Sequence, residues 1–447
     1  MITRLFTLCA VALVGACAGS TESGPSTETA PLLEAPGVAV PATWGGHIEQ
    51  PMVRAPRLAF PTAPVFKETL ELHEWGTFTS VQSPAGDDML GLHHEEEPLP
   101  GFVHGRGTCW GAKCVELVPD VGVTQKMETP VIYFHGRHDA PITVTVGFPQ
   151  GVISQWYPNA ASFLPAIGSL DATQPMSGGS MTWTVELDPE GYSPPEVDPN
   201  GIWAPSRNVD SRPLRAGGED EGFIFYRGLG SFSLPIRTQS DGSGMAQVTN
   251  GGDEAVPAAF LLRVTADDNG SRGAIEALGG IEAGQSKRAT ETPALVSFET
   301  FLEQARVMIH AALVKSGLRA DESWAMVDTW TVSYFHTPGL RVLYVVPRTW
   351  TDAILPLEVD VPMDRIVRTL VGRIELTTAT EVATIRDAAR ESMEAGVYPS
   401  QASYSVPALQ LLGRHAEPKL RAAAQGLPAG ELQAWLLACA ESMVPEG

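Results

Sequence analysis

The sequence has few basic residues and, beyond its N-terminus, no long apolar run. Lys and Arg number 30 against 52 Asp and Glu, so the chain of 447 residues carries a formal net charge of −22. A surface this acidic repels phosphate backbones, which argues against a nucleic-acid partner. No later segment approaches the roughly 18 consecutive apolar residues of a membrane-spanning helix. We therefore expect a protein that neither binds nucleic acid nor threads through a bilayer.

Cysteine is also scarce, and a common hydrolase signature is missing. Cys109 and Cys114 stand in TCWGAKCV. Outside the cytosol this pair predicts a small disulfide loop, because a metal knuckle would need a second pair. Cys439 lies in the apolar segment AWLLACAES and is expected to be a buried free thiol. No Gly-x-Ser-x-Gly occurs, so serine hydrolase chemistry of the usual kind is not expected.

The N-terminus has the layout of an export signal. It reads MITRLFTLCAVALVGAC, in which Arg4 precedes an apolar run and small residues. The end of this stretch resembles the lipobox of bacterial lipoproteins, which implies removal of residues 1–16 and lipidation of Cys17. An ordinary signal peptide is the alternative. Residues 17–64 are proline-rich and predict a flexible spacer, so we expect an exported protein held to a membrane of the cell envelope by lipid.

The remaining chain predicts an α+β fold in three parts. Residues 65–290 are expected to form a β-rich, sandwich-like body with long loops, 291–376 a mixed α/β segment, and 377–447 a helical end. Ser297 can cap a helix that ends near Gly317, and a short helix is expected after Asp321. Strands are expected at 142–148, 181–187, 223–226, 256–265, 340–346 and 366–376. The proline-rich segment 188–222 is too long for hairpin turns and predicts either a binding loop or a poorly ordered one.

Histidine is concentrated in one stretch of the chain. Six of the ten histidines fall between residues 73 and 138: His73, His93, His94, His104, His135 and His138. Glutamates are frequent in the same window. Imidazole and carboxylate are the ligands that zinc and copper use in proteins. This enrichment indicates a possible site for a divalent transition metal, although no pair has a recognised spacing.

The segment HEWGTFTSV places His73 and Glu74 side by side. A zinc protease would need a second histidine at position 77 on a helix, but Thr77 stands there and Gly76 disfavours a helix. The segment predicts a strand, on which successive side chains point to opposite faces. We therefore expect that His73 and Glu74 do not bind one ion together.

Other members of the window could complete a site. His93, His94 and Glu97 lie in HHEEEP, a charge run that predicts either a solvated loop or a metal-binding loop that joins His104 and His135. Strand character at 131–135 would carry Glu128 at one end and His135 at the other. If this strand pairs with 73–81, one sheet edge would gather His73 or Glu74 with Glu128 or His135. The alternative is that each polar group satisfies loop backbone.

Aromatic and arginine side chains suggest a second kind of site. Aromatic faces stack on sugar rings and arginine forks hold carboxylates, which would suit an envelope polysaccharide or another acidic ligand. Burial preferences favour core aromatics and arginines paired with acids instead. In VPRTWTDAILP, Arg348, Trp350 and Asp352 stand at alternating positions after an expected strand end, where sites of α/β proteins are often built. The candidates between residues 156 and 227 and in VPRTWTDAILP are Trp156, Tyr157, Trp203, Arg207, Arg212, Arg215, Tyr226, Arg227, Arg348, Trp350 and Asp352.

Several segments taken together resemble an uncharacterised family of exported proteins of environmental bacteria. They are HEWGTFT, KMETPVIYF, GFIFYRGLGSF, AMVDTW and LRVLYVVPRTWTDAILPL, and they span most of residues 70–376. The resemblance implies one continuous unit and no particular mechanism. Two functions remain open: an envelope protein that binds a ligand or metal ion through loops, and a metal-dependent hydrolase acting on envelope or extracellular polymer.

Overall fold

The computed structural model describes residues 69–442, except 93–98, 107, 111–112, 116–121, 168, 171–172, 268–269 and 333. The expected signal, Cys17 and the spacer lie outside the described residues, as do His93, His94 and Glu97. The described residues belong to one compact unit, 66–447. Helix and strand account for 26% and 37%, so the fold is α+β and β-rich. No helix in the described part of the chain is long and apolar enough to span a membrane.

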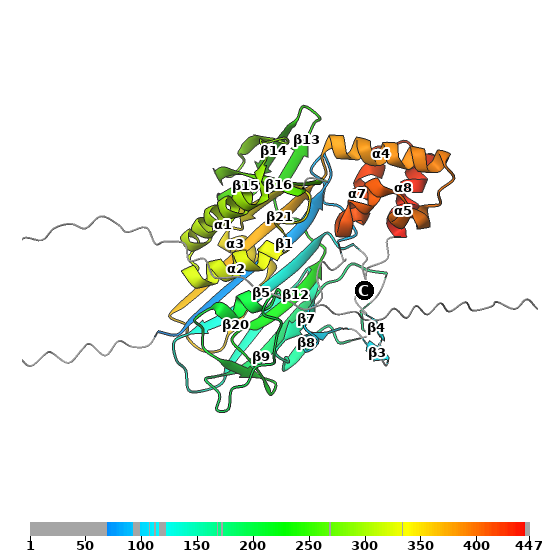
Figure 1. Cartoon of the computed structure of the whole chain (residues 1–447). Helices are drawn as coiled ribbons and strands as arrows, with labels where there is room; N and C mark the ends of the chain where they lie inside the picture. The colour runs from blue at the N-terminus through cyan, green and yellow to red at the C-terminus, as the bar shows by residue number, and fades with distance from the viewer. Residues whose placement is uncertain are drawn as a thin grey trace, which may run out of the picture. The chain divides into compact units, whose positions relative to one another are not determined.

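A ten-stranded sheet forms the centre of this unit (Figure 1). β1 and β21 pair in parallel, and the other described pairings in the sheet are antiparallel. Strands from both sides of the expected boundary at residue 290 thus share one sheet. From edge to edge the order is β18 (Val296–Ser297), β16 (Gly270–Ile281), β15 (Val256–Asp267), β19 (Gly339–Val345), β21 (Arg365–Leu376), β1 (Glu71–Gln82), β5 (Gln125–His135), β12 (Ile224–Gly230), β7 (Gly151–Tyr157) and β2 (His104–Gly105).

A second, six-stranded sheet shares a core with the large sheet and forms the sandwich with it. Its strands β6 and β9 alternate buried and more exposed residues, as the sequence pattern predicts. Their inward side chains, including Val144 and Trp183, share a core with Leu72 and Phe78 of β1. The order is β11 (Glu219–Glu221), β10 (Leu214–Ala216), β9 (Gly179–Leu187), β6 (Ile142–Phe148) and β20 (Leu357–Val359), with β8 (Ser162–Leu164) on β9. A third sheet holds β13 (Ile236–Ser240), β14 (Met245–Asn250) and β17 (Ser286–Thr290).

The opposite face of the large sheet is covered by two helices (Figure 1). α1 (Phe298–Lys315) starts at the Ser297 cap, as expected, and buries Phe301 and Ile309. α2 (Ala320–Val332) packs against α1 and against the short helix η1 (Ala204–Asn208). α3 (Arg348–Ile354) follows β19, so Arg348, Trp350 and Asp352 come directly after a strand end, as expected, and lie on a helix. On this helix, Arg348 and Asp352 meet at the i,i+4 spacing.

The C-terminal helices enclose a small core of their own. Cys439 belongs to it and is a buried free thiol, as expected, and burial raises its pKa to about 12. Arg414, a residue of this helical end, forms an ion pair with Glu128 of β5 in the large sheet. The helices are α4 (Ala379–Glu394), α5 (Pro399–Ser405), α6 (Pro407–Gln410), η2 (Gly413–His415), α7 (Ala416–Ala424) and α8 (Glu431–Glu441).

The cysteine pair lies on a short hairpin of β3 (Thr108–Trp110) and β4 (Lys113–Val115). Cys109 is directly opposite Cys114 in the antiparallel ladder. This register brings the two Cα atoms within the range that a disulfide spans. Their side chains lie outside the described residues, so the disulfide stays a prediction.

A buried carboxylate of the large sheet, Glu375, predicts that the stability of the fold depends on pH. Glu375 is 1% exposed, and its Oε1 lies 2.9 Å from Arg341 Nε and 2.6 Å from Arg373 Nη2. Burial raises the pKa of this carboxyl, but the two guanidinium groups outweigh burial and hold it well below its usual range. A folded pKa below the unfolded value of about 4.3 stabilises the fold above that pH and ceases to do so as the pH falls.

We therefore expect the free energy of unfolding in urea to fall between about pH 5 and about pH 2, and to fall less steeply in Glu375→Gln. Glu358→Gln removes an exposed acid of β20 and should keep the steep dependence. Equal slopes for wild type and Glu375→Gln would contradict the assignment.

Candidate metal centre

Two histidines of the histidine-rich window meet on one face of the large sheet. In the β1–β5 ladder Glu71 stands opposite His135 and His73 opposite Tyr133. His73 and His135 are therefore diagonal neighbours on the same face, with ring centroids 4.8 Å apart. Their exposed fractions are 0% and 3%. The expected pairing of these strands is confirmed, and it brings these two imidazoles together.

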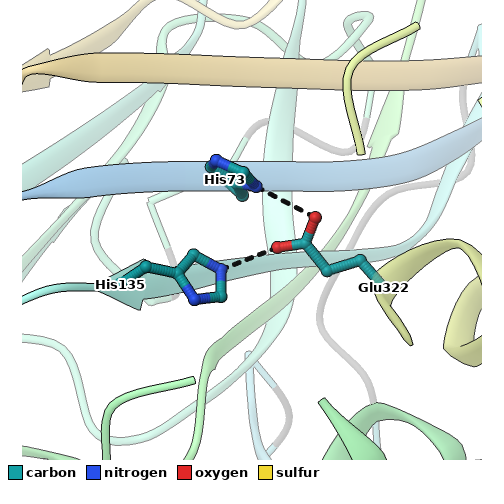
Figure 2. Close-up of side chains that lie close together, drawn as sticks. All are labelled: His73, His135 and Glu322. Carbon is teal, nitrogen blue, oxygen red and sulfur yellow. Dashed lines mark hydrogen bonds and ion pairs between the residues drawn. The ribbon is translucent and has the colours of Figure 1, made fainter. Parts of the chain in front are cut away.

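Glu322, in the first turn of α2, points between the two rings (Figure 2). Its Oε2 lies 2.9 Å from His73 Nδ1, and its Oε1 lies 2.8 Å from His135 Nε2. Oε2 also accepts the Arg319 backbone N–H at 2.8 Å, as a glutamate in a capping box does. Burial raises the pKa of this carboxyl, but the contacts with His135 and His73 outweigh burial and lower it to about 2. Glu322 is thus an ionised, fully buried acceptor.

The outer nitrogens of both rings also face acceptors. His73 Nε2 lies 3.2 Å from Glu71 Oε2, and His135 Nδ1 lies 3.1 Å from the backbone oxygen of Asp210. Asp210 follows η1 in the long 188–222 segment, and its N–H donates to Asp321 Oδ2 at 2.9 Å. An N–H on each outer nitrogen would satisfy these acceptors and fix the tautomer. Such outer contacts to a carboxylate or a carbonyl are typical of metal-binding histidines.

If the proton of each neutral ring sits on the outer nitrogen, the inner nitrogen presents a lone pair to Glu322; in the other tautomer the inner N–H donates to Glu322. A lone pair on His73 Nδ1 or His135 Nε2 would face a carboxylate oxygen at 2.8–2.9 Å, which is repulsive. The repulsion is removed by the opposite tautomer, by a second proton on a ring, or by a cation among the three groups. Two imidazolium ions 4.8 Å apart repel each other and lie at the positive end of α2. One divalent ion carries the same total charge, and Glu322 and Glu71 balance it.

The donor set suits such an ion. One ligand atom from each of His73, His135 and Glu322 can be chosen so that all three lie within 4.8 Å of one another. Zinc bonds of about 2.0–2.1 Å at tetrahedral angles would separate neighbouring ligand atoms by about 3.3 Å. The present 2.8–2.9 Å contacts would open by about half an ångström. Two imidazoles and one carboxylate form a known zinc ligand set.

Other residues of the expected set lie elsewhere. Glu128 accepts hydrogen bonds from Thr79 Oγ1 at 2.7 Å and Tyr334 OH at 2.6 Å, and it pairs with Arg414. His104, on β2, lies 2.8 Å from Glu219 Oε2. Among the described residues, the group with metal-ligand spacing is His73, His135 and Glu322, so neither Glu128 nor His104 belongs to it.

Glu74 faces away from His73, as expected from strand alternation. It pairs with Arg368 of β21 and accepts a hydrogen bond from Tyr226 on the sandwich side of the sheet. Glu74 is 0% exposed. The expectation that Glu74 and His73 point to opposite faces of the strand is confirmed.

The aromatic and arginine candidates do not form an open binding surface. Trp156, Tyr157 and Trp203 are 3–4% exposed and pack in the two cores, so their faces are closed to a sugar ring. Four of the arginines pair with acids: Arg207 with Glu221, Arg212 with Asp188, Arg215 with Asp220 and Arg348 with Asp352. Arg227 is 5% exposed. Burial thus argues against the polysaccharide-binding reading and favours the alternative of core packing and acid pairing.

Glu322 is the residue that sequence reasoning missed. It lies 187 positions after His135 and 249 after His73, so no local spacing connects them. The expected helix after Asp321 did place an acid in a first turn, where acids are common for capping alone. No local pattern in the sequence places this helix start beside the strands that carry the histidines.

Comparisons with known proteins add little here. No family model and no curated protein matches the chain. Among solved structures, the yeast delta-COP-I mu-homology domain complexed with a Dsl1 WxWxV peptide matches with a TM-score of 0.23 at 8% identity, over 69% of this chain and 96% of that chain. The same yeast domain without the peptide matches with a TM-score of 0.23 at 7% identity, over 69% and 95%. Likeness at this level supports no argument about fold or function.

Proposed function

We propose that this protein is an exported, lipid-anchored envelope protein that binds one divalent transition metal ion, with zinc as the best fit, through His73, His135 and Glu322. One observation carries the proposal: the inner nitrogens of two buried histidines converge on one ionised carboxylate while both outer nitrogens face acceptors. Such an ion would join β1 and β5 to α2. Because the unfolded chain lacks the site, binding would add to the stability of the fold.

Burial favours a binding or stabilising role over hydrolysis. A zinc hydrolase keeps one coordination position open to water and substrate. Here the three side chains are 0–3% exposed, and Asp210, from the segment that contains η1, contacts His135. A metal-dependent hydrolase therefore remains the less favoured candidate.

Elemental analysis of the purified full-length protein after zinc loading and desalting tests the proposal. We expect about one equivalent of zinc per chain, and we expect His73→Ala and His135→Ala each to lose it. His104→Ala is the matched control, because this histidine of the same window pairs with Glu219 and should leave the zinc in place. Less than about a tenth of an equivalent in wild type, or equal loss in His104→Ala, would refute the site.

Substitution of Glu71 is expected to weaken zinc binding less than the loss of a ligand, because Glu71 acts through His73. Its carboxylate holds the outer nitrogen of His73, and removing such a group typically weakens metal affinity by about 10–100-fold. Glu71→Ala should therefore raise the zinc Kd within this range in a competition titration with a chelating dye. Unchanged affinity would show that Glu71 does not orient the ring.

A further inference from the structure

A second candidate site lies where the large sheet meets the C-terminal helices. A cleft of about 410 Å³ opens between the end of β15, the start of β19, the residues after β17, the first turns of α4, and α6 and α7. This volume lies in the range of small-molecule sites. Leu340 and Ile385, both 2% exposed, contribute to an apolar wall. The cleft is separate from the proposed metal centre, since it shares no lining residue with it.

The lining of this cleft includes a carboxylate with one buried oxygen that has no partner among the described residues. Glu291 follows β17, is 4% exposed and lines the cleft. Its Oε1 is buried and makes no hydrogen bond to any residue that the structure describes. A buried charged group without a partner is costly, and native proteins retain such groups chiefly where a ligand completes them. Since a carboxylate only accepts hydrogen bonds, the missing partner must be a donor, and a cationic donor fits best.

The cleft also offers a free cation. Arg263 of β15 lines it and is half-buried, and within the described ranges no residue hydrogen-bonds or ion-pairs with its guanidinium. Lys419 lies in the same lining, but it is already paired with Glu381 at 2.7 Å. Among the charged lining residues that the structure describes, those without an ion-pair partner are therefore one carboxylate, Glu291, and one guanidinium, Arg263.

We propose that this cleft binds a small zwitterion, such as a free amino acid or a dipeptide. Its ammonium group contacts Glu291, its carboxylate meets the fork of Arg263, and its side chain rests on the apolar wall. A guanidinium binds a carboxylate through two parallel hydrogen bonds, which gives the ligand a fixed direction. Binding supplies the donor that Glu291 lacks.

Titration of the full-length protein with the common amino acids and with simple dipeptides tests this inference. We expect at least one probe to bind with a Kd below about 1 mM, and we expect its N-acetylated and amidated forms each to bind at least about tenfold more weakly. Comparison of the Kd values of the amino acids with those of the dipeptides identifies the size of the ligand. The absence of any such binding would overturn the proposal.

Variants separate a binding role from a structural one. Glu291→Gln and Arg263→Gln should each raise the Kd of the best probe at least about tenfold, whereas the exposed controls Glu282→Gln and Arg288→Gln should not. Glu291→Gln removes an unpaired buried charge, so its Tm without ligand should equal or exceed that of wild type. A lowered Tm would assign this carboxylate a structural partner, and unchanged probe binding would exclude it from the site; either result would overturn the inference.

Discussion

Glu322→Gln is expected to lower zinc affinity by at least about 100-fold, because it removes the carboxylate that both histidines face. The substitution keeps the size of the side chain and one carbonyl oxygen, so the packing of α2 against the sheet should change little. Isothermal titration calorimetry of the full-length protein measures the loss. Thermal unfolding provides a second readout, since zinc at about 100 times the wild-type Kd should stabilise wild type by about 2.7 kcal/mol and the variant by at most about 0.4 kcal/mol.

Glu303→Gln is the matched control for this substitution. Glu303 is an exposed acid on α1, the helix that packs beside α2. It should bind zinc as wild type does. Equal zinc affinity of wild type and Glu322→Gln would contradict the assigned ligand set, because the remaining two imidazoles could not account for that affinity.

Arg368→Met is expected to lower the free energy of unfolding by about 3–5 kcal/mol. Arg368 and Glu74 pair across β21 and β1 with both side chains at 0% exposure. Without the guanidinium, Glu74 would be a buried charge held only by the hydroxyl of Tyr226, whose pKa burial and Glu74 raise well above its usual range. Equilibrium unfolding in urea measures the loss.

The double variant Glu74→Leu/Arg368→Met should recover most of that stability, since replacing a whole buried pair by apolar groups is often neutral. Arg348→Ala is the control: it breaks the Arg348–Asp352 pair, whose side chains are 43% and 46% exposed, and should cost at most about 1 kcal/mol. A similar loss in Arg348→Ala and Arg368→Met would show that burial does not set the cost.

Local patterns in the sequence were enough to predict the strands that carry the site. Alternation of side chains along 73–81 placed His73 and Glu74 on opposite faces, and the pairing of this strand with 131–135 brought His135 to the His73 face. These relations depend on strand geometry, whose period of two residues is visible in the sequence. The α+β class followed from the same patterns.

The rest of the site depended on packing between distant segments. Glu322 reaches the histidines only because α2 lies across the sheet, an arrangement that no local period encodes. The sequence left Glu128 and His135 as alternative neighbours of His73; seven strand residues separate the two by roughly 20 Å, and the strand register decides for His135. Trp156 and Trp203 could have been either core or surface, since residue type alone does not decide between burial and exposure of an aromatic side chain.

X-ray absorption spectroscopy of the zinc-loaded full-length protein tests the central claim most directly. We expect a zinc shell of two imidazole nitrogens at about 2.0–2.1 Å and carboxylate oxygen at about 2.0–2.2 Å, with no sulfur contribution near about 2.3 Å. Anomalous diffraction from zinc-loaded crystals would place the ion among His73, His135 and Glu322. A shell containing sulfur or a single imidazole, or an anomalous peak at another set of residues, would contradict the account.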